Sequence, residues 1–260
     1  MWVILYLVGV IAVLFCLQTV LLLAYGEPLR WTFGVRAGQP RSLRIALKTA
    51  LQATLIGAIL LYPYLQRTTP VAYYGALLPR HRALEFLYGE VIALGLLAVV
   101  FSMELATGGI RWRVRYPAEK TLARSARSAL SSLTVVAIEE PLFRGIVLQS
   151  LLGAMPAWPA IGLSAALFSA AHFIRKTRTY WPAVGLAVLG LWLGIAYYKT
   201  QSLWLPMGLH SGGILAIGVH RCFIEYQGRE VLVGTQTYPI AGLGAIALML
   251  LGAAATWSLL

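Results

Sequence analysis

Two residue types are missing from the chain and a third is rare. Its 260 residues include no aspartate and no asparagine, and only two cysteines. The absence of aspartate excludes hydrolysis by a pair of aspartates. Cys16 and Cys222 lie in or beside separate apolar segments and match no metal-ligand or redox spacing, so we interpret both as packing residues.

Charge is also scarce. Only 12% of the residues are charged, 59% are hydrophobic, and the mean hydropathy is +0.76, a composition typical of a membrane protein. A helix needs about 20 apolar residues to cross a bilayer, and a spanning backbone must satisfy its hydrogen bonds internally. We therefore predict an all-α polytopic membrane protein with a single domain over residues 1–260. We expect about eight spans, at residues 2–25, 45–65, 84–107, 128–152, 155–174, 181–199, 202–220 and 239–260.

The net charge of +12 comes from cations that are unevenly distributed between the connections. The even-numbered connections hold four, at Arg67, Arg80, Arg82 and Lys199. The odd-numbered ones hold fifteen, at Arg30, Arg36, Arg41, Arg44, Arg111, Arg113, Arg115, Lys120, Arg124, Arg127, Arg175, Lys176, Arg178, Arg221 and Arg229. Because positive loops stay in the cytoplasm, we expect both termini to be non-cytoplasmic. The basic charge therefore reflects the cytoplasmic placement of these loops and their attraction to the anionic lipid bilayer. We expect no nucleic-acid partner.

Three charged residues interrupt the fourth predicted span. Each acidic or basic side chain at a helix centre costs roughly 2.5 to 3.5 kcal/mol, so Glu139, Glu140 and Arg144 need compensation. Glu140 and Arg144 are four residues apart and can form an ion pair on one helix face. Glu139 points about 100° away and has no cation at helical spacing. Pro141 lacks an N–H group, so we expect the helix to kink or open there.

Two histidines lie within other predicted spans. His172 follows Phe168 by four residues on the same helix face, and His210 follows Pro206, which disturbs its helix. Functional polar groups in helix bundles converge on one cavity, so we expect Glu139, His172 and His210 to meet. The other two histidines, His81 and His220, lie at connections or span ends, where water solvates them.

A carboxylate and an imidazole can deprotonate a water that attacks a carbonyl, while a second imidazole stabilises the oxyanion. Glu139, His172 and His210 therefore favour peptide hydrolysis without a cofactor. The same three side chains could instead hold zinc, although the H-E-x-x-H signature is absent. A serine mechanism with Ser164 as nucleophile is a minor alternative, because that residue lies in a run of small residues typical of helix packing. A scaffold or a proton-relaying transporter would also use buried charges.

The order of these motifs resembles the CAAX-type intramembrane endopeptidases, also called the CPBP or Abi family. Their E-E-x-x-x-R motif is similar to Glu139 to Arg144, and their F-x-x-x-H motif to Phe168 to His172. A later span carries a histidine after Ser202-Leu203-Trp204 and Pro206, as His210 does here. The resemblance covers about residues 120–220.

The resemblance implies a glutamate-dependent endopeptidase with eight helices, in which Glu139 and His172 activate water. It implies that Glu140 and Arg144 support the site and that His210 stabilises the oxyanion. The family usually adds an Asn four residues after this histidine, where this chain has Ile214. Ser211, a backbone N–H near Gly212 and Gly213, or a water would have to replace it. Otherwise activity is low, and a scaffold that binds a membrane partner without cleaving it becomes the rival hypothesis.

The expected partner is a membrane-anchored or transmembrane peptide. The family name suggests a prenylated C-terminal tail, whereas the arginine-rich, Asn-free and Asp-free composition is typical of a GC-rich prokaryotic gene. In such an organism the inner or plasma membrane is the expected location, and the C-terminal sorting helix of an exported protein is an equal candidate substrate. The sequence gives no indication of oligomeric state.

Overall fold

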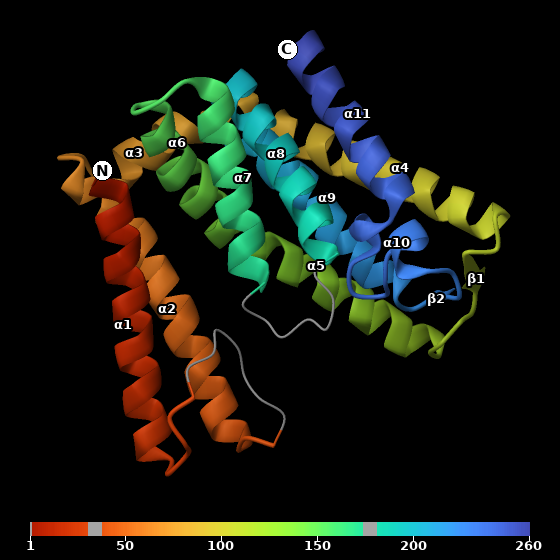
Figure 1. Cartoon of the computed structure of the whole chain (residues 1–260), viewed down its shortest axis with the longest axis horizontal. Helices are drawn as coiled ribbons and strands as arrows, with labels where there is room; N and C mark the ends of the chain where they lie inside the picture. Colours follow the sequence, from red (N-terminus) through yellow and green to blue (C-terminus); the bar gives the residue numbers. More distant parts are fainter. Residues whose placement is uncertain (1, 31–37, 174–180) are drawn as a thin grey trace.

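The computed structural model describes residues 2–30, 38–173 and 181–260. Most of its secondary structure consists of helices that pack side by side, and two short strands form one ribbon (Figure 1). The elements are α1 (Trp2–Ala24), α2 (Arg41–Leu65), α3 (Pro70–Leu77), η1 (Arg80–Arg82), α4 (Leu84–Ala106), β1 (Ile110–Trp112), α5 (Ala118–Glu140), η2 (Pro141–Leu148), α6 (Gln149–Leu152), α7 (Ala157–Phe173), α8 (Pro182–Thr200), α9 (Trp204–His220), β2 (Ile224–Tyr226), α10 (Glu230–Val233), η3 (Pro239–Ala241) and α11 (Leu243–Leu259).

The predicted all-α class is confirmed, and each predicted span coincides with helical structure. Among the described residues, four helices are long and apolar enough to cross a membrane: Val3–Ala24 of α1, α2, α4 and α8. The shorter α11 is also apolar. Together with the composition, these helices make the chain an integral membrane protein. The count of eight spans remains a prediction.

The fourth predicted span opens at Pro141, as expected from the missing N–H group. The α-helix α5 ends at Glu140, and the chain continues as a π-helix, η2, from Pro141 to Leu148. Side chains from neighbouring helices bond to carbonyl groups of this wider helix. The Tyr73 hydroxyl of α3 donates to the Gly145 carbonyl, and the Ser164 hydroxyl of α7 donates to the Phe143 carbonyl at 3.3 Å. The π-helix is therefore fixed in place from two sides.

Helix α9 packs against both α4 and α5, and glycines allow the close approach to α4. A methyl group on Gly89 of α4 would lie 2.6 Å from the Leu205 carbonyl oxygen, and one on Gly212 of α9 would lie 2.7 Å from the Glu90 carbonyl oxygen. These contacts bring the two helix backbones together at the level of His210. The position of this histidine is therefore set by backbone packing.

Strands β1 and β2 form an antiparallel pair in which Arg111 lies opposite Glu225. Three residues per strand are too few to give an alternating pattern, and the sequence analysis did not anticipate them. The pair links the end of α4 to the segment after α9.

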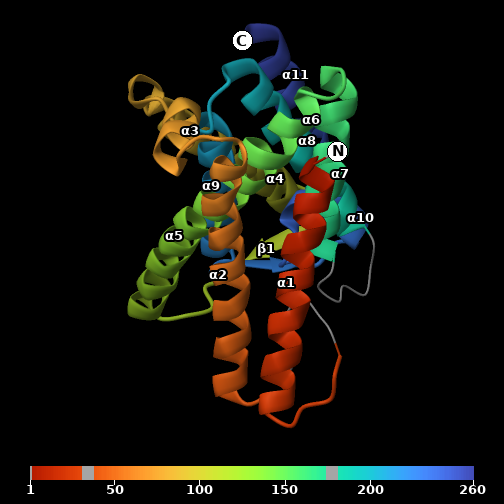
Figure 2. The same cartoon turned by 90° about the vertical axis from the view of Figure 1, so that its left-hand side faces the viewer.

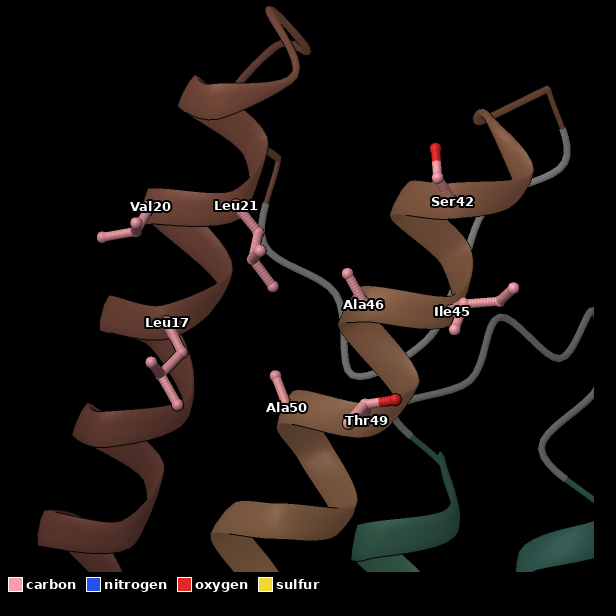
Figure 3. A pocket seen from close by; sticks show the side chains of 8 residues that line it. All are labelled: Leu17, Val20, Leu21, Ser42, Ile45, Ala46, Thr49 and Ala50. Carbon is pink, nitrogen blue, oxygen red and sulfur yellow. The ribbon is translucent and has the colours of Figure 1, made fainter.

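Helices α1 and α2 run side by side and extend beyond the rest of the molecule (Figure 2). An apolar groove lies between them (Figure 3). It is lined by Leu17, Val20, Leu21, Ser42, Ile45, Ala46, Thr49 and Ala50. No lining residue belongs to the helices that carry the predicted site.

Two predictions about single residues are wrong. His220 is not solvated: it is 4% exposed, its ring stacks on Phe101 with centroids 4.9 Å apart, and its Nδ1 lies 2.6 Å from the Ile217 carbonyl. Cys16 is exposed rather than packed inside the protein, because it points outward from α1. Cys222 is buried, as expected, and His81 is exposed.

Candidate active site

Three segments that are distant in sequence meet around Glu139 and Glu140. The two glutamates end α5, and Arg144 follows one turn later in η2. Phe168 and His172 lie near the end of α7, and His210 lies in α9. These six residues form two layers, one partly exposed and one buried.

The outer layer consists of Glu139 and the two imidazoles that face it. Oε2 of Glu139 lies 3.5 Å from Nε2 of His172 and 3.9 Å from Nε2 of His210. Both distances exceed a normal hydrogen bond, and this oxygen has no hydrogen-bond partner among the described residues. The Glu139 and His172 side chains are 25% and 23% exposed, so this layer is partly exposed.

The inner layer is an ion pair with a histidine attached to it. Nη1 of Arg144 donates to Oε1 of Glu140 at 3.1 Å, as the i, i+4 spacing predicted, and both side chains are 0% exposed. The second nitrogen, Nη2, donates to the Gly190 carbonyl of α8 at 3.2 Å. Nδ1 of His210 lies 2.7 Å from the same Glu140 oxygen. Removing one member of such a buried group would leave an uncompensated charge.

Phe168 contacts residues of both layers. Its fully buried ring lies 4.6 Å from the His172 ring and 5.6 Å from the His210 ring, centroid to centroid. The Arg144 guanidinium lies over the same ring at 4.7 Å. One phenyl ring thus packs against both histidines and the buried cation. Nδ1 of His172 in turn lies 2.8 Å from the Phe168 carbonyl oxygen.

These contacts assign the ring protons of the histidines. A carbonyl oxygen only accepts hydrogen bonds, so His172 donates from Nδ1 and keeps the Nε2 lone pair for a proton or a water. Ionised Glu140 also only accepts, so His210 donates from Nδ1, and its Nε2 becomes a donor only when the ring is protonated. The two imidazoles that face Glu139 are therefore suited to different roles.

The structure does not bring Ser211 into this group. Its buried hydroxyl donates to Oε1 of Glu90 at 3.0 Å and lies 3.2 Å from the Ser132 hydroxyl. The Ser211 hydroxyl is therefore engaged on another face of α9 and does not replace the missing asparagine beside His210. Glu90 was not predicted from the sequence, where its only signal is a carboxylate in the apolar segment that forms α4.

Ser164 is buried and bonded to the Phe143 carbonyl, and His210, a base that a serine mechanism could use, is bonded to Glu140. These contacts agree with a packing role for this serine. Within the described ranges, no group of three or more His, Cys or acidic side chains is arranged to hold a metal ion. The cations predicted at Arg175, Lys176 and Arg178 lie outside the described residues.

The fold and the site together define a class: a helical membrane protein with a carboxylate–imidazole group next to a buried ion pair. A comparison with protein families finds a match over part of the chain. Residues 123–213 match the family described as type II CAAX prenyl endopeptidase Rce1-like, which confirms the resemblance drawn from the three motifs. The match includes all six residues of the two layers. No curated protein and no solved structure gives a significant match to the chain.

Proposed function

We propose that the chain is an intramembrane endopeptidase that hydrolyses a peptide bond near the membrane with a water activated by Glu139 and His172. The observation that carries the proposal is the position of Glu139 Oε2, which faces Nε2 of both His172 and His210. A water that bridges Glu139 Oε2 and His172 Nε2, which are 3.5 Å apart, would lie about 2.8 Å from each of these two atoms. The family match over residues 123–213 supports a protease of this class.

In the first step, Glu139 and His172 position the water. The Nε2 lone pair of His172 and the Glu139 carboxylate each accept a hydrogen bond from it. As the water oxygen attacks the carbonyl carbon of the scissile peptide bond, one water proton passes to Glu139. The carbonyl oxygen becomes the oxyanion of a tetrahedral intermediate.

In the second step, His210 stabilises the oxyanion. With Nδ1 bonded to Glu140, Nε2 of His210 donates to the substrate oxygen when the ring is protonated. Collapse of the intermediate breaks the C–N bond, and the proton on Glu139 passes to the leaving nitrogen. The products are a carboxylic acid and an amine, and Glu139 returns to its starting form.

Glu140 and Arg144 act through His210 rather than on the substrate. Both side chains are fully buried, and their contacts are with His210, Phe168 and Gly190. We assign them a positioning role, in which Arg144 holds the Glu140 carboxylate and Glu140 holds the His210 ring.

For the substrate we propose a peptide held at the membrane by a lipid or by its own helix. The family name supports a prenylated C-terminal CAAX tail. The sorting helix of an exported protein, the second candidate from the sequence, fits the same site chemistry. Matched peptides with and without a prenyl group distinguish the two in a cleavage assay.

The test is cleavage by the full-length protein in detergent or vesicles. We expect Glu139→Gln to lower kcat by roughly 10² to 10⁴, because an amide cannot accept the proton of the water. Glu119→Gln is the matched control: it changes an exposed carboxylate of the same helix and should leave the rate unchanged. Equal rates for Glu139→Gln and the unmodified protein would rule out this mechanism.

The two rival hypotheses make different predictions in the same assay. A zinc-dependent version would lose activity with a chelator and regain it with zinc, whereas the proposed mechanism is insensitive to both. The scaffold hypothesis is favoured by one observation, the engagement of Ser211 by Glu90 with isoleucine at position 214. A scaffold would bind its membrane partner without cleaving it, and Glu139→Gln would leave that binding unchanged.

A further inference from the structure

A second surface of functional interest lies away from the candidate active site, at the start of α5 and the adjoining strand β1. We call it the interfacial face. It combines exposed apolar side chains with exposed cations: Trp112, Val114, Lys120, Leu122, Arg124, Arg127, Leu130 and Leu133. In Figure 1 the first half of α5 runs past the β1–β2 ribbon at the edge of the molecule.

The apolar side chains of this face are unusually exposed. Trp112 and Val114 are each 62% exposed, Leu122 is 72% exposed and Leu130 is 69% exposed. Trp112 is held in place by stacking on Phe223, with ring centroids 5.1 Å apart. Such a row of large apolar groups beside arginines is not a typical water-facing surface.

Helix geometry separates the two kinds of side chain on α5. At 100° per residue, Leu122, Leu130 and Leu133 lie within about 80° of one another. Lys120, Arg124 and Arg127 lie within about 60° of one another, and the leucine stripe lies between them and the buried stripe of Ser132 and Val136. A helix with this arrangement can place its leucines among acyl chains and its cations at the headgroups.

Among the described residues, the α5 cations form no ion pair, although Glu119 is exposed in the first turn of the same helix. The one acidic group on the ribbon, Glu225, is already paired with Arg111 and Arg113. Lys120 and Arg124 instead lie over the Tyr116 ring, at 4.8 Å and 4.6 Å from its centroid. Burial lowers the pKa of the Arg221 guanidinium, and nearby Arg124 lowers it further, so like charges are crowded here.

We propose that the interfacial face binds anionic phospholipid headgroups at the surface of the bilayer that contains the protein. Trp112, Leu122 and Leu130 would enter the outermost acyl region, and Lys120, Arg124 and Arg127 would contact phosphates. A nucleic acid or an acidic protein would match the charge but would leave the exposed leucines in water, which favours lipid as the partner. This inference is independent of the proposed protease activity.

The first test uses vesicles of phosphatidylcholine with 30% phosphatidylglycerol. Full-length protein is extracted from them, and native mass spectrometry counts the phosphatidylglycerol that stays bound. We expect the double variant Arg124→Gln/Arg127→Gln to lose roughly tenfold or more of its preference for the anionic lipid. The matched double variant Arg67→Gln/Arg80→Gln, which removes two exposed cations at the other end of the molecule, should keep it. Equal retention in all three proteins, or an equal loss in both variants, would overturn the proposal.

The second test measures how deeply position 122 lies in the bilayer. A fluorophore attached to Leu122→Cys in a Cys16→Ser background should be quenched by a nitroxide near the lipid headgroup and protected from iodide in water. Quenching by iodide alone would show that the face is exposed to water. Loss of iodide quenching only when an acidic peptide is added would assign the surface to a protein partner and would also overturn the proposal.

Discussion

Position 214 lies one helical turn after His210 on α9, on the same face of the helix. An asparagine there could donate a second hydrogen bond to the oxyanion, and one such donor is worth on the order of 10² to 10³ in rate. We expect Ile214→Asn to increase kcat by a factor of up to about 10² to 10³. Ile214→Leu is the control for a change of side-chain shape alone, and kcat in the standard cleavage assay is the measurement. An unchanged kcat for Ile214→Asn would mean that this position does not face the oxyanion.

At the same scale, the sequence predicted contacts that depend on one helix better than contacts between helices. The Glu140–Arg144 pair follows from i, i+4 spacing, which survives the change from α-helix to π-helix at Pro141. The meeting of Glu139 with His172 and His210 rested on motif order and on the tendency of polar groups to converge. The Ser211 hydroxyl donates to Glu90 rather than facing the group around Glu139. The rotation of α9 against α4 sets this contact and cannot be read from either helix alone.

At the level of elements, the contact between α4 and α9 is the one most sensitive to side-chain size. A methyl group on Gly208 would overlap the Phe86 carbonyl oxygen, so the two backbones would have to separate. We expect Gly208→Ala to lower the free energy of unfolding by about 1 to 3 kcal/mol and to reduce activity, since α9 carries His210. Thermal unfolding in detergent measures the first effect.

Gly213→Ala is the matched control for this prediction. It lies on the same helix, and a methyl group there would meet nothing within 4 Å. It should unfold like the unmodified protein. If both alanine variants unfolded at the same temperature as the unmodified protein, the α4–α9 approach would not be as close as described.

The β1–β2 ribbon should respond to acid. Hydrogen bonds from Arg111 and then from Arg113 hold the pKa of Glu225 below its ordinary range. A lowered folded-state pKa means that this carboxylate stabilises the ribbon above its unfolded pKa of about 4.3. This stabilisation of the ribbon is lost as the pH falls through the folded-state pKa of Glu225.

We therefore expect the amides of β1 to exchange hydrogen faster below about pH 4, in the range where the lowered folded-state pKa of Glu225 is titrated. Hydrogen exchange followed by mass spectrometry measures this change. In Glu225→Gln the ribbon should be equally loose below about pH 4 and at pH 7, apart from the intrinsic pH dependence of exchange. Persistent acid sensitivity in that variant would assign the effect to another group.

The two elements that the sequence did not predict, the ribbon and the π-helix, have different physical causes. Three-residue strands carry no periodicity, and their pairing depends on two segments more than a hundred residues apart. Pro141 signalled a break in the helix, but the wider turn also depends on Tyr73 and Ser164, which bond its carbonyl groups from α3 and α7. Such tertiary partners cannot be read from the segment itself.

For the whole molecule, hydropathy identified the lipid-facing helices and was less informative for those that bear the site. Helices α1, α2 and α4 expose many apolar side chains and meet the length and apolarity of a span. The first half of α5 is rich in arginine and serine, and α7 and α9 have only 17 residues each. A polar site inside a helix bundle needs such segments, because its groups face other helices rather than lipid.

The same division predicts an orientation of the molecule in the membrane. Strand β1, the first half of α5 and α10, which Arg229 precedes, lie toward one end of the bundle, whereas Arg80 belongs to η1, just before the start of α4 toward the other end. If the cation-rich end is cytoplasmic, a cysteine at position 229 will react with an impermeant maleimide only after the membrane is opened, and one at position 80 will react in intact cells. Both variants are made in a Cys16→Ser background, where Cys222 is buried and should not react. The reverse labelling pattern would place both termini in the cytoplasm and would move the interfacial face to the outer leaflet.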